Sequence, residues 1–265
     1  MRWTMAGRPG RRASALDRRW QAHEQLGYQS QCRGLGQRQR HQSVLLRSHR
    51  EFSQPAHSDH PNTRKLEESM TRVHCDLSML LDGFITGPDE GMEKPLRDDA
   101  GRLHDWMCDA RAGADAEVLD ELYARTGAIL MGRRMFDVGV EPWGDPPPFH
   151  MPVSVLTHEA RDPIPRQGGT TYTFVTDGSE AGLERARGAA GKKDVGIWGG
   201  ANIVRQYPRA GLLDEMQIHL VPVLLGYGVR LFEDLGLGQT ELERTRTIET
   251  PKTTHLRFII TKRAR

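Results

Sequence analysis

Long hydrophobic runs, paired cysteines and metal-binding motifs are all absent from this sequence. No stretch of about 18 apolar residues occurs among its 265 residues, so no membrane-spanning helix is expected. Cys32, Cys75 and Cys108 are widely spaced and form no C-x-x-C pair, which argues against a disulfide framework and a structural zinc site. The 11 histidines form no H-x-x-x-H or H-E-x-x-H motif, which argues against metal catalysis. We therefore expect a cytoplasmic protein with no membrane partner and no metal.

Apolar residues are also scarce, at 37% of the chain, where globular domains have roughly 45–50%. The shortage lies in residues 1–69, which are rich in Arg, Gln, Ser and His, carry a net charge of +7 and show no apolar periodicity. Residues 70–265 carry a net charge of −5. The composition therefore predicts a basic, disordered N-terminal extension over 1–69 and one folded domain over 70–265.

Three interpretations of the extension remain open. The favoured one is a functionally silent segment, produced by translation that starts too early, because Met70 directly precedes a strand-like run. A basic arm could instead bind nucleic acid by counterion release, and an Arg-rich, acid-poor start could be an organellar transit peptide. We favour a protein without a nucleic-acid partner.

From Thr71 onward, short β-rich runs alternate with helical stretches. Strands are expected at 73–80, 84–85, 128–131, 153–157, 172–176, 195–198, 216–225 and 255–262, and helices at 117–125, 179–190 and 202–207. Gly127 is expected to end the first of these helices. The alternation predicts an α/β fold with a central mixed, mostly parallel sheet flanked by helices. Because no long helix separates the last two strand runs, they should form an antiparallel C-terminal edge.

Two glycine turns follow predicted strands and precede predicted helices. In DVGIWGGANIV (194–204), the two glycines let the backbone approach a ligand, and the amide groups of a helix start attract a pyrophosphate. A plain tight turn is an equally good interpretation. In GAILMGRRMFDVG (127–139), Gly132 permits close approach and Arg133 or Arg134 could bind a phosphate, although arginine at a helix start is more often a solvated charge.

A third turn lies in LSMLLDGFITG (77–87), where an Asp-Gly pair interrupts an apolar run. This break could expose Asp82 at a cleft, but a structural turn is the more common meaning of such a pair.

Together with AGLLDEMQIHLVPVLLGYGVRLFEDL (210–235), these stretches resemble the dihydrofolate reductase-like superfamily. The resemblance is to the branch similar to the C-terminal reductase domain of the bifunctional riboflavin-biosynthesis deaminase-reductase, and it runs from about residue 71 to 262. It implies a dihydrofolate reductase-like fold that binds NADPH at the carboxyl ends of the strands and reduces a small heterocyclic or carbonyl-type substrate. The deaminase signature H-x-E with P-C-x-x-C is absent, so that second activity is not expected.

The resemblance also implies roles for individual residues. The turn over the cofactor diphosphate, whose Gly-Gly peptide is commonly cis, and the helix start after it match Gly199, Gly200, Ala201 and Asn202. The second cofactor turn matches Gly132 and Arg133, and the pair that holds the adenosine 2′-phosphate matches Thr157 and His158. The wall beside the nicotinamide matches Asp82, Gly83 and Ile85. The Asp214–Glu215 pair matches a motif for which we expect a structural role.

Two departures from the family pattern affect the chemistry. Met135 stands where the family usually has threonine, which removes a hydroxyl that would bond to the cofactor or the backbone. Folate reductases also place a carboxylate on the preceding helix, because reduction of a C=N bond needs a proton as well as a hydride. Its counterparts here are Asp115, Ala116 and Glu117. We take Glu117, with Asp82, as the candidate catalytic residues, although a glutamate in the first helical turn more often complements the helix dipole.

Alternatives to this function stay open at this point. A riboflavin-pathway aminouracil-phosphate reductase would need basic residues at the substrate end, which Lys94, Arg97 and Arg102 could supply. A nucleotide- or nucleic-acid-binding protein without turnover is the alternative of another class. In the long polar segment 87–107, His104 and Trp106 either touch substrate or anchor the segment to the core. We also expect a homodimer, formed through an exposed edge strand in 216–225 and 255–262.

Overall fold

The computed structural model describes residues 71–87, 101–108, 113–236 and 238–261. The segment 1–69, with the three interpretations of its role, and the basic candidates Lys94 and Arg97 lie outside these residues. Within the described part, no helix is long and apolar enough to cross a membrane.

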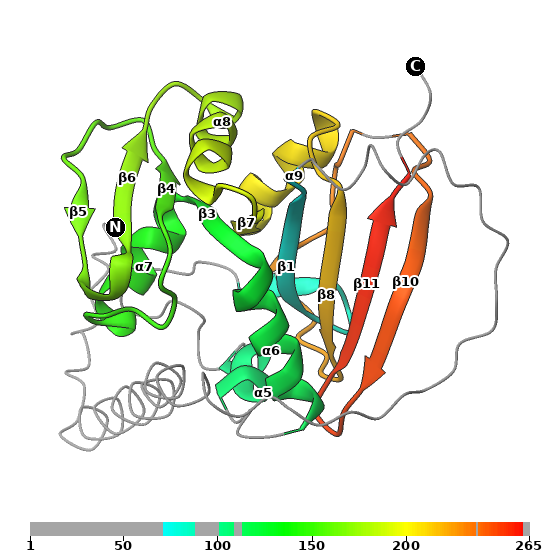
Figure 1. Ribbon diagram of the computed structural model, residues 1–265. Helices are drawn as coiled ribbons and strands as arrows, with labels where there is room; N and C mark the ends of the chain where they lie inside the picture. The colour runs from blue at the N-terminus through cyan, green and yellow to red at the C-terminus, as the bar shows by residue number, and fades with distance from the viewer. Residues whose placement is uncertain (1–70, 88–100, 109–112, 237, 262–265) are drawn as a thin grey trace, which may run out of the picture.

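Nine strands form one mixed sheet in the order β10-β11-β8-β1-β7-β3-β4-β6-β5 (Figure 1). The six central strands run parallel to one another. They are β8 (Glu215–Val221), β1 (Val73–Leu80), β7 (Asp194–Trp198), β3 (Thr126–Gly132), β4 (Val153–Leu156) and β6 (Thr171–Val175). Antiparallel strands close both edges: β11 (Thr254–Ile260) and β10 (Leu242–Glu249) on one side and β5 (Ile164–Pro165) on the other. The predicted fold class is thereby confirmed.

Helices cover both faces of this sheet because the parallel strands are apolar on both sides. The helices α8 (Ser179–Ala190) and α9 (Ala201–Arg209) pack on the face that carries Cys75, Leu130 and Ile197 (Figure 1). The opposite face is covered by α5 (Asp105–Cys108), α6 (Ala114–Arg125) and α7 (Arg133–Trp143). A short second sheet pairs β2 (Phe84–Thr86) with β9 (Val229–Arg230), and short 3-10 turns lie at Gly101–His104 and Gln167–Gly169.

The strand β10 was not predicted from the sequence, and it changes the expected edge. Its sequence, LERTRTIE, has little apolar alternation, and most of its residues are exposed. In the structure β8 lies between β1 and β11, and β11 lies between β8 and β10. The expectation that 216–225 and 255–262 leave an apolar edge strand open is therefore wrong, because the edge belongs to the charged strand β10. Homodimer formation stays a prediction, but an open apolar edge strand no longer supports it.

The prediction that Gly127 ends a helix is wrong. This glycine lies inside β3. The helix α6 ends at Arg125, and the strand begins at the next residue. A Cβ atom on Gly127 would come within 2.4 Å of the backbone oxygen of Ala190 at the end of α8. The glycine is therefore required for close packing of a helix end against the strand, and not for a turn.

Candidate active site

The two glycine turns lie side by side at the carboxyl edge of the sheet. Met131 and Trp198 are paired across β3 and β7, so Gly132 and Gly199 leave the sheet next to each other. A Cβ atom on Gly199 would lie 3.2 Å from the sulfur of Met135, which belongs to α7. The structure therefore brings together the two turns that the sequence singled out.

Both turns lead directly into helices whose first amide groups are free of side-chain caps. Gly132 is the N-cap of α7 and Gly200 is the N-cap of α9, and neither helix has a side-chain hydrogen bond to its cap among the described residues. Uncapped amide groups and the positive ends of two helix dipoles favour an anion at this place. Ala201 is buried and Asn202 is exposed in the first turn of α9. The arrangement can therefore hold a phosphate or diphosphate group.

The two glycines of the second turn differ in their backbone. Gly199 has φ of +132°, which a residue with a side chain rarely adopts, whereas Gly200 has φ of −68°. No heavy atom of the described residues lies within 4 Å of a Cβ built on Gly200. Among the described residues only Asp145–Pro146 is a cis peptide, so the Gly199–Gly200 peptide is trans and the cis peptide that the resemblance implied is not found.

Arg133 lies next to Thr157, as the resemblance implied, but two carboxylates lie there as well. The Arg133 guanidinium donates to both oxygens of Asp137, at 2.8 and 2.7 Å, and lies 3.5 Å from the Thr157 hydroxyl. The carboxylate of Glu159 is also 3.5 Å from Arg133. His158, between Thr157 and Glu159, is exposed. Arg161 lies 4.0 Å from Asp137, so two arginines face two carboxylates and this corner of the site is close to electrically balanced.

The carboxylate of Asp82 holds the turn between β1 and β2 against the segment that follows β8. Its Oδ2 accepts the backbone amides of Leu225 and Gly226, both at 2.7 Å, and its carbonyl oxygen accepts the guanidinium of Arg230 at 2.9 Å. Desolvation opposes ionisation, but these amide donors hold the pKa of Asp82 below its usual range. The geometry matches the structural-turn interpretation, in which Asp82 ties the β1–β2 turn to the segment after β8 and stays ionised.

The inward-facing carboxylate of α6 is Asp115, two positions before the predicted Glu117. Glu117 is exposed in the first turn of the helix. Asp115 points to the interior, where its Oδ1 accepts a hydrogen bond from His255 Nε2 at 2.8 Å. Glu117 is turned to solvent, so its catalytic role stays a prediction, and Asp115 is the carboxylate of this first turn that faces the interior.

Asp115 is one end of a buried chain of hydrogen bonds that the sequence analysis missed. His255 Nδ1 lies 2.6 Å from His219 Nδ1, and His219 Nε2 lies 2.6 Å from Asp76 Oδ1. The ring of Trp106 packs on both histidines, with centroids 4.3 and 4.9 Å away. Trp106 therefore anchors its segment to the core, as one of the two interpretations of 87–107 proposed. The third basic candidate, Arg102, is exposed and lies 3.6 Å from Asp105.

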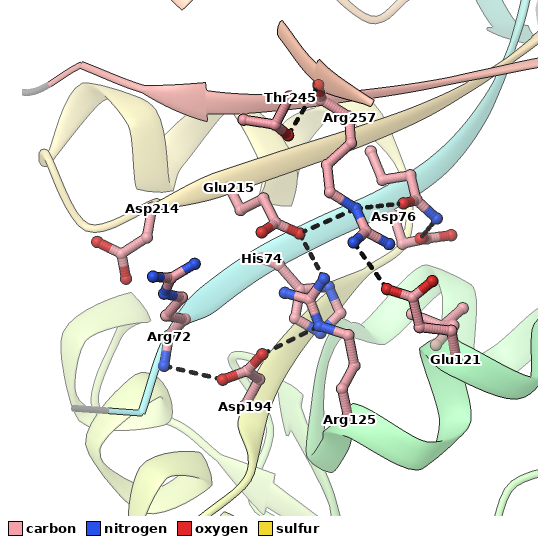
Figure 2. Close-up of polar contacts among 12 residues, drawn as sticks. Arg72, His74, Asp76, Glu121, Arg125, Asp194, Asp214, Glu215, Thr245 and Arg257 are labelled. Atoms are coloured by element: carbon pink, nitrogen blue, oxygen red, sulfur yellow. Dashed lines mark hydrogen bonds and ion pairs between the residues drawn. The ribbon is translucent and has the colours of Figure 1, made fainter. Parts of the chain in front are cut away.

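A second polar cluster joins α6 to strands on the same face of the sheet (Figure 2). Arg125 donates to Glu215 at 2.5 Å and to Asp194 at 3.0 Å, and Glu215 is 5% exposed. The carboxylate of Asp214 accepts the backbone amide of Val73 at 2.9 Å. These contacts give the Asp214–Glu215 pair the structural role that the sequence predicted.

Two histidines of the interior, the buried His74 and the partly buried His104, make the fold sensitive to acid. Burial, together with the charge of Arg125 for His74 and of His219 for His104, lowers the pKa of each to about 4. Unfolded histidine binds a proton near pH 6.5, so the unfolded chain binds more protons than the folded one between these values. Folding stability should therefore fall as the pH drops from about 6.5 to about 4, by at most about 3 kcal/mol for each histidine.

Thermal unfolding of the wild type and of His104→Leu across this pH range measures the effect. His104 Nδ1 is buried and has no partner among the described residues, so leucine should leave the protein at least as stable near neutral pH. The variant should lose less of its unfolding temperature on acidification. Equal losses in both proteins would contradict the prediction.

Comparisons with known proteins support the resemblance seen in the motifs. The family model of the RibD C-terminal domain matches residues 71–256. The uncharacterized proteins YyaP and YwjB of Bacillus subtilis (strain 168) are also similar. YyaP is 24% identical over 170 residues, covering 62% of this chain and 81% of YyaP, and YwjB is 30% identical over 87 residues, covering 33% of this chain and 49% of YwjB. A solved structure of a protein assigned to riboflavin biosynthesis in Shewanella sp. PV-4 has the same fold, with 21% identity and a TM-score of 0.54 over 73% of this chain and 100% of that chain.

Proposed function

This chain belongs to the family of RibD C-terminal domains, and from that premise we propose that it is a reductase that uses NADPH to reduce a small heterocyclic or carbonyl-type substrate. The family supports a reductase of the riboflavin-pathway type, and we propose NADPH as its cofactor and a small heterocyclic or carbonyl-type compound as its substrate. The observation that carries the cofactor is the pair of uncapped helix starts, α7 and α9, at the ends of two neighbouring strands.

The residues at these turns fit the phosphate groups of a dinucleotide. The open position over Gly200 leaves room for a diphosphate beside the amides of Ala201 and Asn202. Arg133 and Thr157 are close enough to share a further phosphate on the adenosine side. When bound, the nicotinamide supplies the hydride. The chain's own part is to fix the position of the cofactor and the substrate and to keep water away.

The test is binding followed by turnover, with the full chain. NADPH and NADH are titrated by nicotinamide fluorescence and by thermal shift, and NADPH oxidation is then followed with the aminouracil phosphate of the riboflavin pathway and with dihydrofolate. Saturable NADPH binding supports the proposal, and its absence overturns it. Turnover of the aminouracil phosphate identifies the narrower riboflavin-pathway activity, and binding without turnover of any carbonyl or C=N compound identifies a nucleotide-binding protein.

The carboxylate of Glu159 should weaken binding of the 2′-phosphate that distinguishes NADPH from NADH. It is 79% exposed and lies 3.5 Å from Arg133, so it competes with a phosphate for the same guanidinium. In Glu159→Gln we expect NADPH affinity to rise about fivefold, because an exposed charge pair contributes up to about 1 kcal/mol. Fluorescence titration at low ionic strength measures the change.

NADH affinity is the internal control, because NADH carries no 2′-phosphate. Glu184→Gln is the matched variant: Glu184 is also an exposed glutamate paired with an arginine, Arg187, but on α8. An equal gain for NADH and NADPH in Glu159→Gln, or a gain in Glu184→Gln, would place the 2′-phosphate elsewhere.

A further inference from the structure

The geometry of the hydrogen-bonded chain Asp76–His219–His255–Asp115 determines how many protons these four side chains hold. Each histidine directs Nε2 to a carboxylate and Nδ1 to the other histidine. An ionised carboxylate only accepts hydrogen bonds, so both Nε2 atoms must carry a proton. A neutral imidazole protonated at Nε2 has a lone pair at Nδ1, and two lone pairs cannot form the 2.6 Å contact between the rings.

A third proton must therefore lie in this chain. The number of protons is the same if one carboxylate is protonated instead of a histidine. Each of the three hydrogen bonds needs one proton, and two neutral histidines supply only two. We propose that the four residues form a proton-donating site, which stores one excess proton between His219 and His255 and releases it through Asp115.

The surroundings indicate where the positive charge lies. Burial alone would raise the pKa of Asp76, but the charge of His219 and its hydrogen bond hold it below the usual range. The side-chain amide of Gln217 donates a second hydrogen bond to Asp76, at 2.8 Å. Burial and the charge of His219 lower the pKa of His255, although Asp115 acts in the opposite direction. The positive charge therefore lies at the contact between the two imidazole rings, flanked by Asp76 at one end and Asp115 at the other.

The other ionisable groups around the cluster do not compete for this proton. His104, from the 3-10 turn before α5, and His74, on β1, both have a pKa lowered to about 4. On β11, Arg257 is turned away and donates to Gln217 and to Glu121 of α6. Asp105, on α5, pairs with Arg102.

Asp115 is the end from which a proton can leave. Its side chain is 18% exposed, against 7% for Asp76, 1% for His219 and 3% for His255. It stands in the first turn of α6, and the strand register places His255 and His219 level with Ser78, two residues before the end of β1. The outlet therefore lies toward the same edge of the sheet as the glycine turns.

Release moves protons only and needs no oxidant or reductant. The shared proton passes to His255 Nδ1, the proton on His255 Nε2 passes to Asp115 Oδ1, and Asp115 gives it to a nitrogen or oxygen of the acceptor. The cluster becomes one unit more negative and is refilled from water. The identity of the acceptor rests on the proposed function: reduction of a C=N or C=O bond needs a proton at the heteroatom, and Asp115 would deliver it there.

Histidine ¹⁵N NMR of the full chain tests the store without cofactor or substrate. We expect protons on both Nε2 atoms and one strongly deshielded proton that couples the two Nδ1 atoms, with assignment through His219→Asn and His255→Asn. If both histidines are neutral with one N–H each, the proposal is overturned, whether or not the protein reduces anything.

Exchange of the shared proton with water tests the outlet. In Asp115→Asn the amide cannot relay a proton, so exchange should slow by about 100-fold or more, the lower end of what a positioned proton-transfer side chain contributes. Asp115→Glu should restore it, and Asp120→Asn, an exposed carboxylate on the same helix, is the control. Backbone spectra confirm that each variant is folded. Unchanged exchange in folded Asp115→Asn overturns release through Asp115, and NADPH titration judges the reductase function separately.

Discussion

Replacing Gly200 by aspartate is expected to abolish dinucleotide binding and to leave the fold intact or slightly more stable. Gly200 has φ of −68°, and a new Cβ meets no described atom within 4 Å, so the side chain can be accommodated. Aspartate is a preferred N-cap, and its carboxylate would accept the first amides of α9, stabilising the protein by about a few tenths of a kcal/mol relative to glycine. The same carboxylate would occupy the place of the diphosphate and repel it.

We expect the dissociation constant for NADPH to rise at least about 100-fold, which corresponds to about 2.7 kcal/mol. Fluorescence titration measures the affinity and urea denaturation measures the stability. A loss of affinity together with a gain in stability cannot arise from misfolding. For this reason the pair of measurements is more informative than either one alone.

Two further variants separate charge from size at this turn. Gly200→Asn supplies a cap without a charge and should weaken NADPH binding much less than Gly200→Asp. Gly188→Asp makes the same change on the exposed surface of α8, where an added Cβ also meets no described atom within 4 Å. It should bind NADPH like the wild type. Normal NADPH binding by Gly200→Asp would move the diphosphate away from α9.

The backbone of the candidate site was predictable because glycine turns and strand periods are local signals. The sequence placed turns at Gly132 and Gly199, each after an apolar run, and parallel pairing of β3 with β7 brings those turns together. Periodicity alone could not show that the two strands are neighbours, because two α-helices, a 3-10 turn and three strands separate them along the chain. The ordered motifs of the family resemblance supplied that step.

The polar side chains of the site were harder to predict, because their partners come from distant strands. Asp76 alternates with apolar residues on β1, a pattern that indicates a strand with one polar face and does not show what that face contacts. Its partner His219 lies 143 residues away. The choice between Asp115 and Glu117 depended on the rotation of α6, which sequence spacing leaves uncertain by a residue or two. Tertiary packing sets this rotation, and it turns Asp115 toward His255.

The largest stability effect is expected for Glu215→Ala. Glu215 is buried at the start of β8, 2.5 Å from Arg125 at the end of α6, and Arg125 also binds Asp194 of β7 (Figure 2). Removing the glutamate leaves the half-buried Arg125 charge with one carboxylate fewer, and Arg257, 3.6 Å from Glu215, loses a neighbour as well. We expect the free energy of unfolding to fall by about 3–5 kcal/mol, the usual cost of breaking a buried ion pair on one side.

Glu121→Ala is the matched control, because Glu121 also pairs with Arg257 but its side chain is 36% exposed. Its loss should be only about 1 kcal/mol, since solvent screens the exposed pair. The double variant Arg125→Met/Glu215→Leu should recover much of the stability, because it removes both buried charges and fills their volume. Urea denaturation measures all three. Similar losses in Glu215→Ala and Glu121→Ala would mean that Arg125 reaches water once Glu215 is gone, and the pair would then not be what holds α6 against β8.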